Sequence, residues 1–189
     1  NPFFAILAAV AVLAGCVAPQ VATRPVSRAE VETAFMLNGR FSVRTSKDSG
    51  TGRIAWQHTL AQDDLTLSTP IGTGLARLER RDGLYTLETA DGRRASDRDP
   101  DALTEQLLGW RLPIAGLPFW VRARARPGEA FQVERDESRR VTSMQQSGWL
   151  IEYPSYFDNG ELPRQIRMRR DPFDIRLVLD EWQPIAMKP

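Results

Sequence analysis

The sequence has one cysteine and one histidine in 189 residues, and this scarcity excludes several kinds of site. A single cysteine cannot form an intramolecular disulfide or a cysteine zinc site, so the folded domain must be stabilised by its core. The acidic residues show no calcium-loop spacing, and residues 72–74 lack the Gly-Lys-Ser/Thr ending of a phosphate-binding loop. We therefore predict no metal site and no cofactor.

The single histidine also argues against a hydrolase. His58 shares a strand pattern and a face with Ile54 and Trp56, and the sequence contains no Gly-x-Ser-x-Gly motif or comparable nucleophile motif. We interpret His58 as a pocket or core residue and predict no catalytic residues and no enzyme.

An excess of charge of one sign is missing as well. The 25 basic residues nearly balance 24 acidic ones, which gives a formal net charge of +1. Because no global field attracts a polyanion, we predict no nucleic-acid partner.

Long apolar runs are absent except at the start, where residues 3–13 are apolar. This run has the length of a secretory h-region and is too short to cross a bilayer as a helix. It ends in Leu13-Ala14-Gly15-Cys16, the lipobox pattern, so we predict a lipoprotein signal peptide over residues 1–15 and a lipid on Cys16. The alternative is an ordinary signal peptide with an incidental cysteine. Because neither Met nor a basic n-region precedes the run, we expect further residues upstream.

The rest of the chain is expected to form one domain behind a tether. Residues 16–26 are small or polar with two prolines, which predicts a lipidated, flexible N-terminus. We place a single domain at residues 27–189. Ser27 and Glu30 form a capping box, and a short helix is predicted from the spacing of Val31, Ala34 and Phe35.

From residue 37 onward, apolar and polar residues alternate, which is typical of strands with one wet face. The apolar members are Leu37, Gly39, Phe41, Val43; Ile54, Trp56, His58, Leu60; Leu65, Leu67; Phe131, Val133; Trp149, Ile151, Tyr153; Ile166, Met168; and Ile175, Leu177, Leu179. Many one-sided strands indicate antiparallel pairing, and turn sequences such as Asp82-Gly83 separate them. We predict about ten or eleven strands.

Two helices interrupt the strands. Asp99 is the expected N-cap, Pro100 the first helical residue and Gly109 the stop. A second short helix at residues 117–122 is apolar on more than one side, so something must cover it. A large antiparallel sheet curled round both helices, with an apolar space between, would do so.

Two features leave alternatives open. The five tryptophans are mostly core by expectation, but some could line a cavity for an apolar ligand. Ile71 lies at a turn between two strands, either tucked under the hairpin or exposed as an apolar probe for a membrane.

These features together resemble the LolB family of outer-membrane lipoprotein receptors. The resemblance is carried by the lipobox and by segments 37–43, 54–58, 68–72, 108–113 with Trp120-Val121, 148–153, Leu162-Pro163 and 175–182, in that order and spacing. The soluble LolA carriers share the fold but have an ordinary signal peptide without the lipobox cysteine.

The resemblance implies an incomplete (half) antiparallel β-barrel of about 11 strands with a helical lid over an apolar cavity. It implies a monomer, lipid-anchored in the outer membrane and facing the periplasm, that accepts acylated lipoproteins from a LolA-like carrier and inserts them into outer-membrane lipid. The family's insertion loop falls on Pro70, Ile71 and Gly72, with isoleucine where leucine is usual. Val17 replaces the aspartate that commonly retains lipoproteins in the inner membrane.

Two further sets of residues are candidates. The acyl cavity is predicted to be lined by Phe41, Trp56, Leu67, Leu103, Leu107, Trp120, Trp149 and Ile151. Arg122, Arg124 and Arg126 alternate after the second helix, as a rim for carrier docking or merely a solvated edge. The competing hypothesis from another class is a lipid-anchored structural or assembly scaffold with a fully packed core.

Overall fold

The computed structural model describes residues 34–185, and these form one antiparallel sheet of eleven strands with two short helices. In chain order the elements are β1 (Phe35–Arg44), β2 (Ser49–His58), β3 (Gln62–Ser68), β4 (Gly74–Arg81), β5 (Leu84–Thr89), β6 (Arg94–Asp97), α2 (Pro100–Leu108), α3 (Leu117–Trp120), β7 (Phe131–Arg135), β8 (Val141–Gln146), β9 (Trp149–Tyr156), β10 (Pro163–Arg170) and β11 (Phe173–Pro184). The predicted signal peptide, Cys16 and the tether lie outside the described residues.

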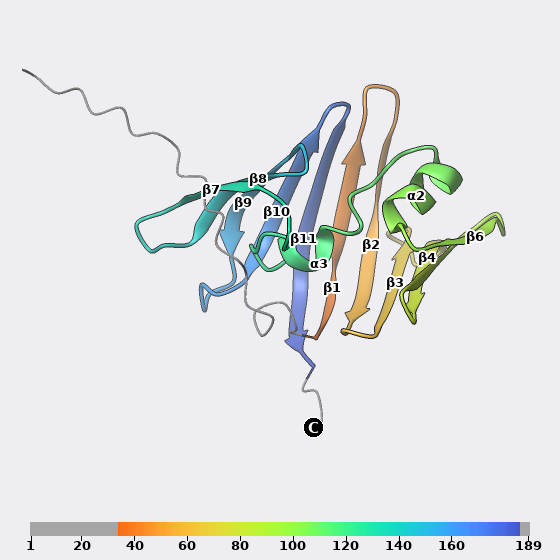
Figure 1. Cartoon of the computed structure of the whole chain (residues 1–189), viewed down its shortest axis with the longest axis horizontal. Helices are drawn as coiled ribbons and strands as arrows, with labels where there is room; N and C mark the ends of the chain where they lie inside the picture. The colour runs from red at the N-terminus through yellow and green to blue at the C-terminus, as the bar shows by residue number, and fades with distance from the viewer. Residues whose placement is uncertain (1–33, 186–189) are drawn as a thin grey trace, which may run out of the picture.

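The sheet is a series of hairpins with one exception at its centre. Its strand order is β6-β5-β4-β3-β2-β1-β11-β10-β9-β8-β7, so the first and last strands pair with each other. Within the described residues β6 and β7 form the two open edges, and the sheet does not close into a barrel. Figure 1 shows the sheet curving round α2 and α3, which lie on the same side of it.

The core lies between the sheet and the helices because alternate strand residues point to that side. Leu37, Ile54, Leu65 and Leu78 come from four successive strands of one half of the sheet, and each is at most 5% exposed. The other half contributes a matching set of Met144, Ile151, Ile166, Met168 and Leu177. The predicted fold class, a mostly β half-barrel with helices over one face, is confirmed.

The capping prediction for α2 is confirmed. The Asp99 carboxylate accepts hydrogen bonds from the backbone N–H groups of Asp101 and Ala102, at 3.0 and 3.2 Å. Gly109 ends the helix in the left-handed region at φ 79°, where glycine has no steric penalty. The second helix, α3, is shorter than predicted, because helical residues end at Trp120 and the chain leaves through turns.

Two local predictions were wrong. Phe35 was expected to end a helix, but it begins β1, paired with His58 on one side and Pro184 on the other. Leu60 was expected to continue β2, but that strand ends at His58 and Leu60 is 44% exposed in the turn. As a result Asp63 lies in β3, with its side chain facing the core.

The hairpins place the loops at two opposite edges of the sheet. One edge, here called the Ile71 edge, carries the β3–β4 loop together with the β1–β2, β8–β9 and β10–β11 turns. The opposite edge carries the β2–β3, β4–β5, β7–β8 and β9–β10 turns. This arrangement separates the Ile71 loop from the pocket at the β7–β8 and β9–β10 hairpins, and both are described below.

Candidate functional site

The β3–β4 loop holds one apolar side chain out in solvent. Ile71 is 91% exposed, whereas the other exposed large apolar residues of the described range are 37% to 46% exposed. The loop is closed by hydrogen bonds from Thr69 N to Thr73 O (2.7 Å), Gly72 N to Thr69 O (2.9 Å) and Thr73 N to Thr69 Oγ1 (3.0 Å). Gly72 has φ 94°, a conformation that glycine adopts at little cost. Ile71 is therefore displayed, not tucked under the hairpin.

The base of this loop packs on the sheet beside a predicted cavity residue. Pro70 and Phe41 line the same pocket of about 330 Å³ next to β1 and β2. Gly52 permits the Phe41 ring to lie against β2, because a Cβ there would lie 2.7 Å from that ring. The structure thus brings the loop and one end of the predicted cavity set together.

The predicted cavity residues all lie in or against one apolar core. Six of the eight are buried, from 0% exposure at Leu103 and Ile151 to 8% at Leu107, while Phe41 and Leu67 are half-buried. Trp120 on α3 packs against Trp149 on β9, with ring centroids 6.4 Å apart. These side chains pack together between the sheet and the helices.

A buried glutamine that the sequence pattern did not reveal ties α3 to the sheet. Gln146 Oε1 accepts from Trp120 Nε1 (2.9 Å) and from the Arg126 backbone N–H (2.8 Å), and Gln146 Nε2 donates to the Arg126 carbonyl (2.8 Å). The Tyr153 hydroxyl donates to the Trp120 carbonyl at 3.1 Å. Burial, and then the neighbouring Tyr156, raises the pKa of Tyr153 well above its usual value, so this hydroxyl remains a donor.

Polar contacts nearer the surface add to the buried packing of Leu103 and Leu107 on α2. Arg111 bridges Asp99 at 2.5 Å and Glu105 at 3.3 Å, and Arg93 Nη1 donates to the Leu107 carbonyl at 2.5 Å. The side chains of Arg111 and its two partners are 44% to 59% exposed, so solvent screens these ion pairs. We call residues 100–126, which contain α2 and α3, the helical lid.

His58 takes part in a buried polar network with Trp56, Asp63 and Arg80. Its Nδ1 lies 2.6 Å from Asp63 Oδ1, the same oxygen that accepts from Trp56 Nε1 at 3.0 Å, and Arg80 Nε donates to Asp63 Oδ2 at 2.5 Å. Burial alone would raise the pKa of Asp63, but hydrogen bonds and charge from His58 and Arg80 outweigh it, so the pKa lies below its usual value. The sequence contained no pattern linking these residues.

The three candidate docking arginines differ in their surroundings. Arg122 is only 5% exposed, its Nε donates to the Pro118 carbonyl at 2.8 Å, and its guanidinium lies over the Phe35 ring. Burial, and then the nearby charge of Arg124, lowers the pKa of Arg122 to about 10, so it remains a cation at neutral pH. Arg124 is exposed, and half-buried Arg126 pairs with Glu129 at 2.9 Å. Arg124 is thus the most exposed of the three.

Two further observations limit the chemistry of residues 34–185. No three or more His, Cys, Asp or Glu side chains gather there in a way that would hold a metal ion. In the same stretch, neither helix has the length and apolar character needed to cross a bilayer.

The fold defines the class of protein. The structure aligns with a LolA superfamily protein from Nitrosomonas europaea, at TM-score 0.50 and 10% identity, over 83% of this chain and 88% of that one. It aligns with a domain from Vibrio parahaemolyticus named for outer-membrane lipoprotein sorting, at TM-score 0.52 and 8% identity, over 82% and 87%. The chain therefore shares the open half-barrel fold of these two proteins.

Sequence comparison assigns the family within that class. The family model described as outer membrane lipoprotein LolB matches residues 33–182. The outer-membrane lipoprotein LolB of Pseudomonas paraeruginosa is 39% identical over 80% of this chain and 75% of the relative. That of Pseudomonas syringae pv. syringae is 38% identical over 79% and 74%. The chain belongs to the LolB family, as the resemblance in the sequence predicted.

Proposed function

We propose that this chain is a lipid-anchored outer-membrane receptor that accepts acylated lipoproteins from a LolA-like periplasmic carrier and inserts them into the outer membrane. Membership of the LolB family supports this function, and the display of Ile71 on a closed loop is the structural observation that carries it. The receptor works as a monomer facing the periplasm and acts by binding and release, not as an enzyme.

The covalent anchor keeps the receptor beside its target membrane. We propose that residues 1–15 are removed as a signal peptide, that Cys16 carries the lipid and that residues 16–26 form the tether. The family match begins at residue 33, which leaves room for such a tether before the domain. Loss of labelling by radioactive palmitate in cells expressing Cys16→Ser would test the anchor.

The cargo needs a shielded path because each methylene transferred into water costs about 0.8 kcal/mol. Several fatty chains therefore cannot cross the periplasm exposed. We propose that the acyl chains bind between the sheet and the helical lid, against the predicted lining residues. Since Trp120, Leu103 and their neighbours already fill this space, loading must displace the lid from the sheet.

Displacement of the lid also accounts for release. Closing the lid again restores the contacts among Leu103, Trp120 and Trp149, which compete with the bound acyl chains. The bilayer offers the chains an apolar environment without that competition. Cargo should therefore pass from the receptor to the membrane without an external energy source.

The Ile71 loop is the proposed contact with the membrane. Its hydrogen bonds hold the backbone, so the isoleucine enters the bilayer surface without ordering a flexible segment first. The base of the loop lies beside Phe41, at one end of the predicted lining set. An acyl chain leaving the core at this end would emerge close to the membrane.

A transfer assay tests the function and the loop separately. A non-lipidated form starting after Cys16 receives a fluorescently labelled lipoprotein from the cognate carrier and is then mixed with liposomes. We expect Ile71→Glu to accept cargo like the wild type but to insert it at least about tenfold more slowly, because a charge near the bilayer costs more than 1.4 kcal/mol. Ile71→Leu is the matched control and should insert normally. If the wild type accepts nothing from a competent carrier, the receptor function is wrong and the scaffold hypothesis is favoured.

The carrier should dock near the lid, where Arg124 and Arg126 lie. Arg124 is the exposed member, so it offers the more accessible charge for steering an acidic partner. In the same assay, a weaker salt dependence of carrier-to-receptor transfer for Arg124→Gln would support this role.

A further inference from the structure

A second pocket lies on the edge opposite to Ile71. Its volume is about 420 Å³, and it lies between residues 122–125 and the β7–β8 and β9–β10 hairpins. The floor is apolar. Val141 and Met144 are 4% and 1% exposed and belong to the main core, and half-buried Phe131 and Val133 extend the floor outward along β7. The pocket is therefore an outward continuation of the apolar interior.

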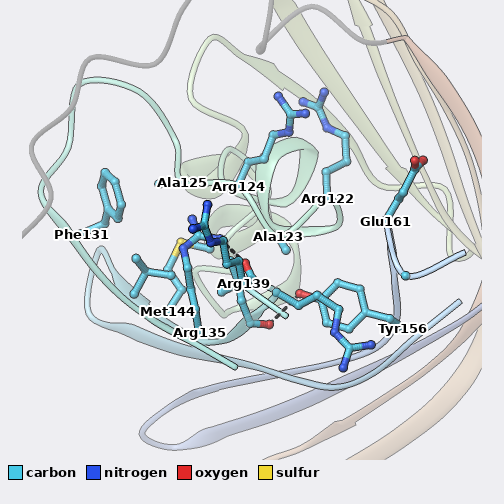
Figure 2. A pocket seen from close by; sticks show the side chains of 14 residues that line it. Arg122, Ala123, Arg124, Ala125, Phe131, Arg135, Arg139, Met144, Tyr156 and Glu161 are labelled. Atoms are coloured by element: carbon cyan, nitrogen blue, oxygen red, sulfur yellow. Dashed lines mark hydrogen bonds between the residues drawn. The ribbon is translucent and has the colours of Figure 1, made fainter. Parts of the chain in front are cut away.

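The rim of this pocket is strongly cationic. Its lining includes five arginines but one acidic residue, Glu161. In Figure 2, Arg122 and Arg124 extend from the segment after α3, whereas Arg135 and Arg139 come from the β7–β8 hairpin near Met144. Arg135 and Arg139 are both exposed.

The fifth arginine is already engaged in holding the hairpin. Arg140 pairs with Asp136 at 2.8 Å and lies over the Tyr156 ring, 5.5 Å from its centroid. Arg135 Nη1 donates to the Arg139 carbonyl at 2.9 Å, which keeps the two side chains on one tight turn. Arg135 and Arg139 are thus exposed rim cations on the hairpin itself.

We propose that this pocket binds a single lipid molecule that has one acyl chain on the apolar floor and a phosphate head group at the arginine rim. Guanidinium groups bind phosphate through paired, charge-assisted hydrogen bonds, and the floor offers apolar surface that an anion alone would leave unused. An acidic protein segment would use the rim but would leave the half-buried Phe131 and Val133 without an apolar partner.

The position of the pocket indicates a lipid monomer and not a membrane surface. The pocket is formed by turns of the edge opposite to Ile71, so it faces away from a bilayer that the Ile71 loop has entered. A lipid bound there has left the membrane. The inference concerns a second ligand and does not depend on transfer of lipoprotein cargo.

Calorimetric titration of the full domain with three probes tests the proposal. The probes are palmitoyl-lysophosphatidylglycerol below its micelle concentration, monopalmitoylglycerol, which has the same chain without phosphate, and inorganic phosphate. We expect the lysolipid to bind at least about tenfold more tightly than the monoglyceride, as expected for hydrogen bonds to a charged group. Inorganic phosphate should bind more weakly than the lysolipid. Equal affinity for both lipids, or for lysolipid and phosphate, would overturn the proposal.

The variant Arg135→Gln/Arg139→Asn should lose the preference for the phosphate head. Asparagine suits position 139 because φ there is 64°. The matched control Arg44→Gln/Arg94→Gln removes two exposed arginines that do not line the pocket and should keep the preference.

Retention of the preference in the pocket variant would contradict the proposal. So would displacement of the lysolipid by an acidic peptide at equal concentration, which would assign the rim to a protein. Cargo transfer measured on the same samples keeps the two functions apart. Normal transfer by a wild type that binds no lysolipid would overturn this inference alone, whereas lysolipid binding without transfer would support it and overturn the receptor function.

Discussion

At the scale of single residues, Asp63 is a buried carboxylate with three side-chain partners. Its carboxylate is buried and meets Trp56, His58 and Arg80 at once, at the end of the β2–β3 hairpin. Arg80 also donates to the carbonyls of Thr59 and Leu60, so the same guanidinium fixes the turn. One carboxylate thus holds the register of three strands.

Asp63→Ala should lower the free energy of unfolding by about 3 to 5 kcal/mol at pH 7, because it leaves the Arg80 charge buried without its anion. Urea unfolding followed by tryptophan fluorescence measures the loss. Asp64→Ala removes an exposed neighbour that pairs with Arg77, and this control should cost less than about 1 kcal/mol. Similar losses in the two variants would contradict the central role of Asp63.

Wild type and Asp63→Ala also test how the stability contribution of Asp63 depends on pH. Because the pKa of Asp63 is lower in the folded state, its contribution to stability is complete above the unfolded pKa of about 3.9 and is lost as the pH falls through the folded value. The stability difference between wild type and Asp63→Ala should therefore be constant from pH 7 to pH 5 and shrink below about pH 4. A difference that persists at pH 2 would mean that packing, not charge, is lost.

At the scale of elements, the two helices of the lid differ in the polar contacts that attach them. Buried hydrogen bonds of Gln146 and Tyr153 hold α3, while screened ion pairs of Arg111 support α2. The Arg111 ion pairs therefore add little to the attachment that buried Leu103 and Leu107 give to α2.

Gln146→Leu should loosen α3 without changing the volume of the core much. The Trp120 Nε1–H and the Arg126 backbone N–H lose a buried acceptor, so stability should fall by about 1 to 3 kcal/mol. Hydrogen–deuterium exchange should accelerate at residues 117–126 more than in β1. Gln145→Leu, at the adjacent exposed position, is the control and should leave both quantities near wild type. Unchanged exchange at α3 would refute the anchoring role.

Much of the element pattern could be predicted from the sequence because alternation and caps are local. The strands through Ile54 and Ile151 follow a period of two, and Asp99 and Gly109 bound α2. The predictions failed where two periods coincide. Phe35 fits both a helical spacing and the strand that continues to Leu37, and only pairing with β2 and β11 decides between them.

The candidate site was less predictable than the fold. The turn at Ile71 left open whether the side chain is tucked or exposed, and only the structure shows it exposed. The roles of Gln146 and Asp63 depend on partners 20 and 17 residues away, such as Arg126 and Arg80. Neither polar residue stands out locally, because an alternating strand pattern predicts a face and not a bonding partner. Whether tryptophans fill the interior or line a void is likewise a matter of packing volume.

At the scale of the whole molecule, the filled interior makes a prediction about cargo binding. If acyl chains replace lid contacts, loading with a lipoprotein should increase hydrogen–deuterium exchange in residues 100–126 while the central strands stay protected. The apo receptor at the same concentration is the reference, and cargo lacking its acyl chains is the control that should cause no change. Protection of the lid on loading would instead indicate a cavity that exists before the cargo arrives.

The pairing of β1 with β11 has a consequence for how the chain reaches this structure. The middle of the sheet joins the two ends of the domain, at residues such as Gly39 and Leu179, while every other strand pair is a local hairpin. Two stacks of hairpins, β1–β6 and β7–β11, can each begin to form early, but their seam requires nearly the full length of chain. A ribosome or translocation channel that still holds the last strand therefore holds back the central strand pair, and a nascent chain completes its fold only on release.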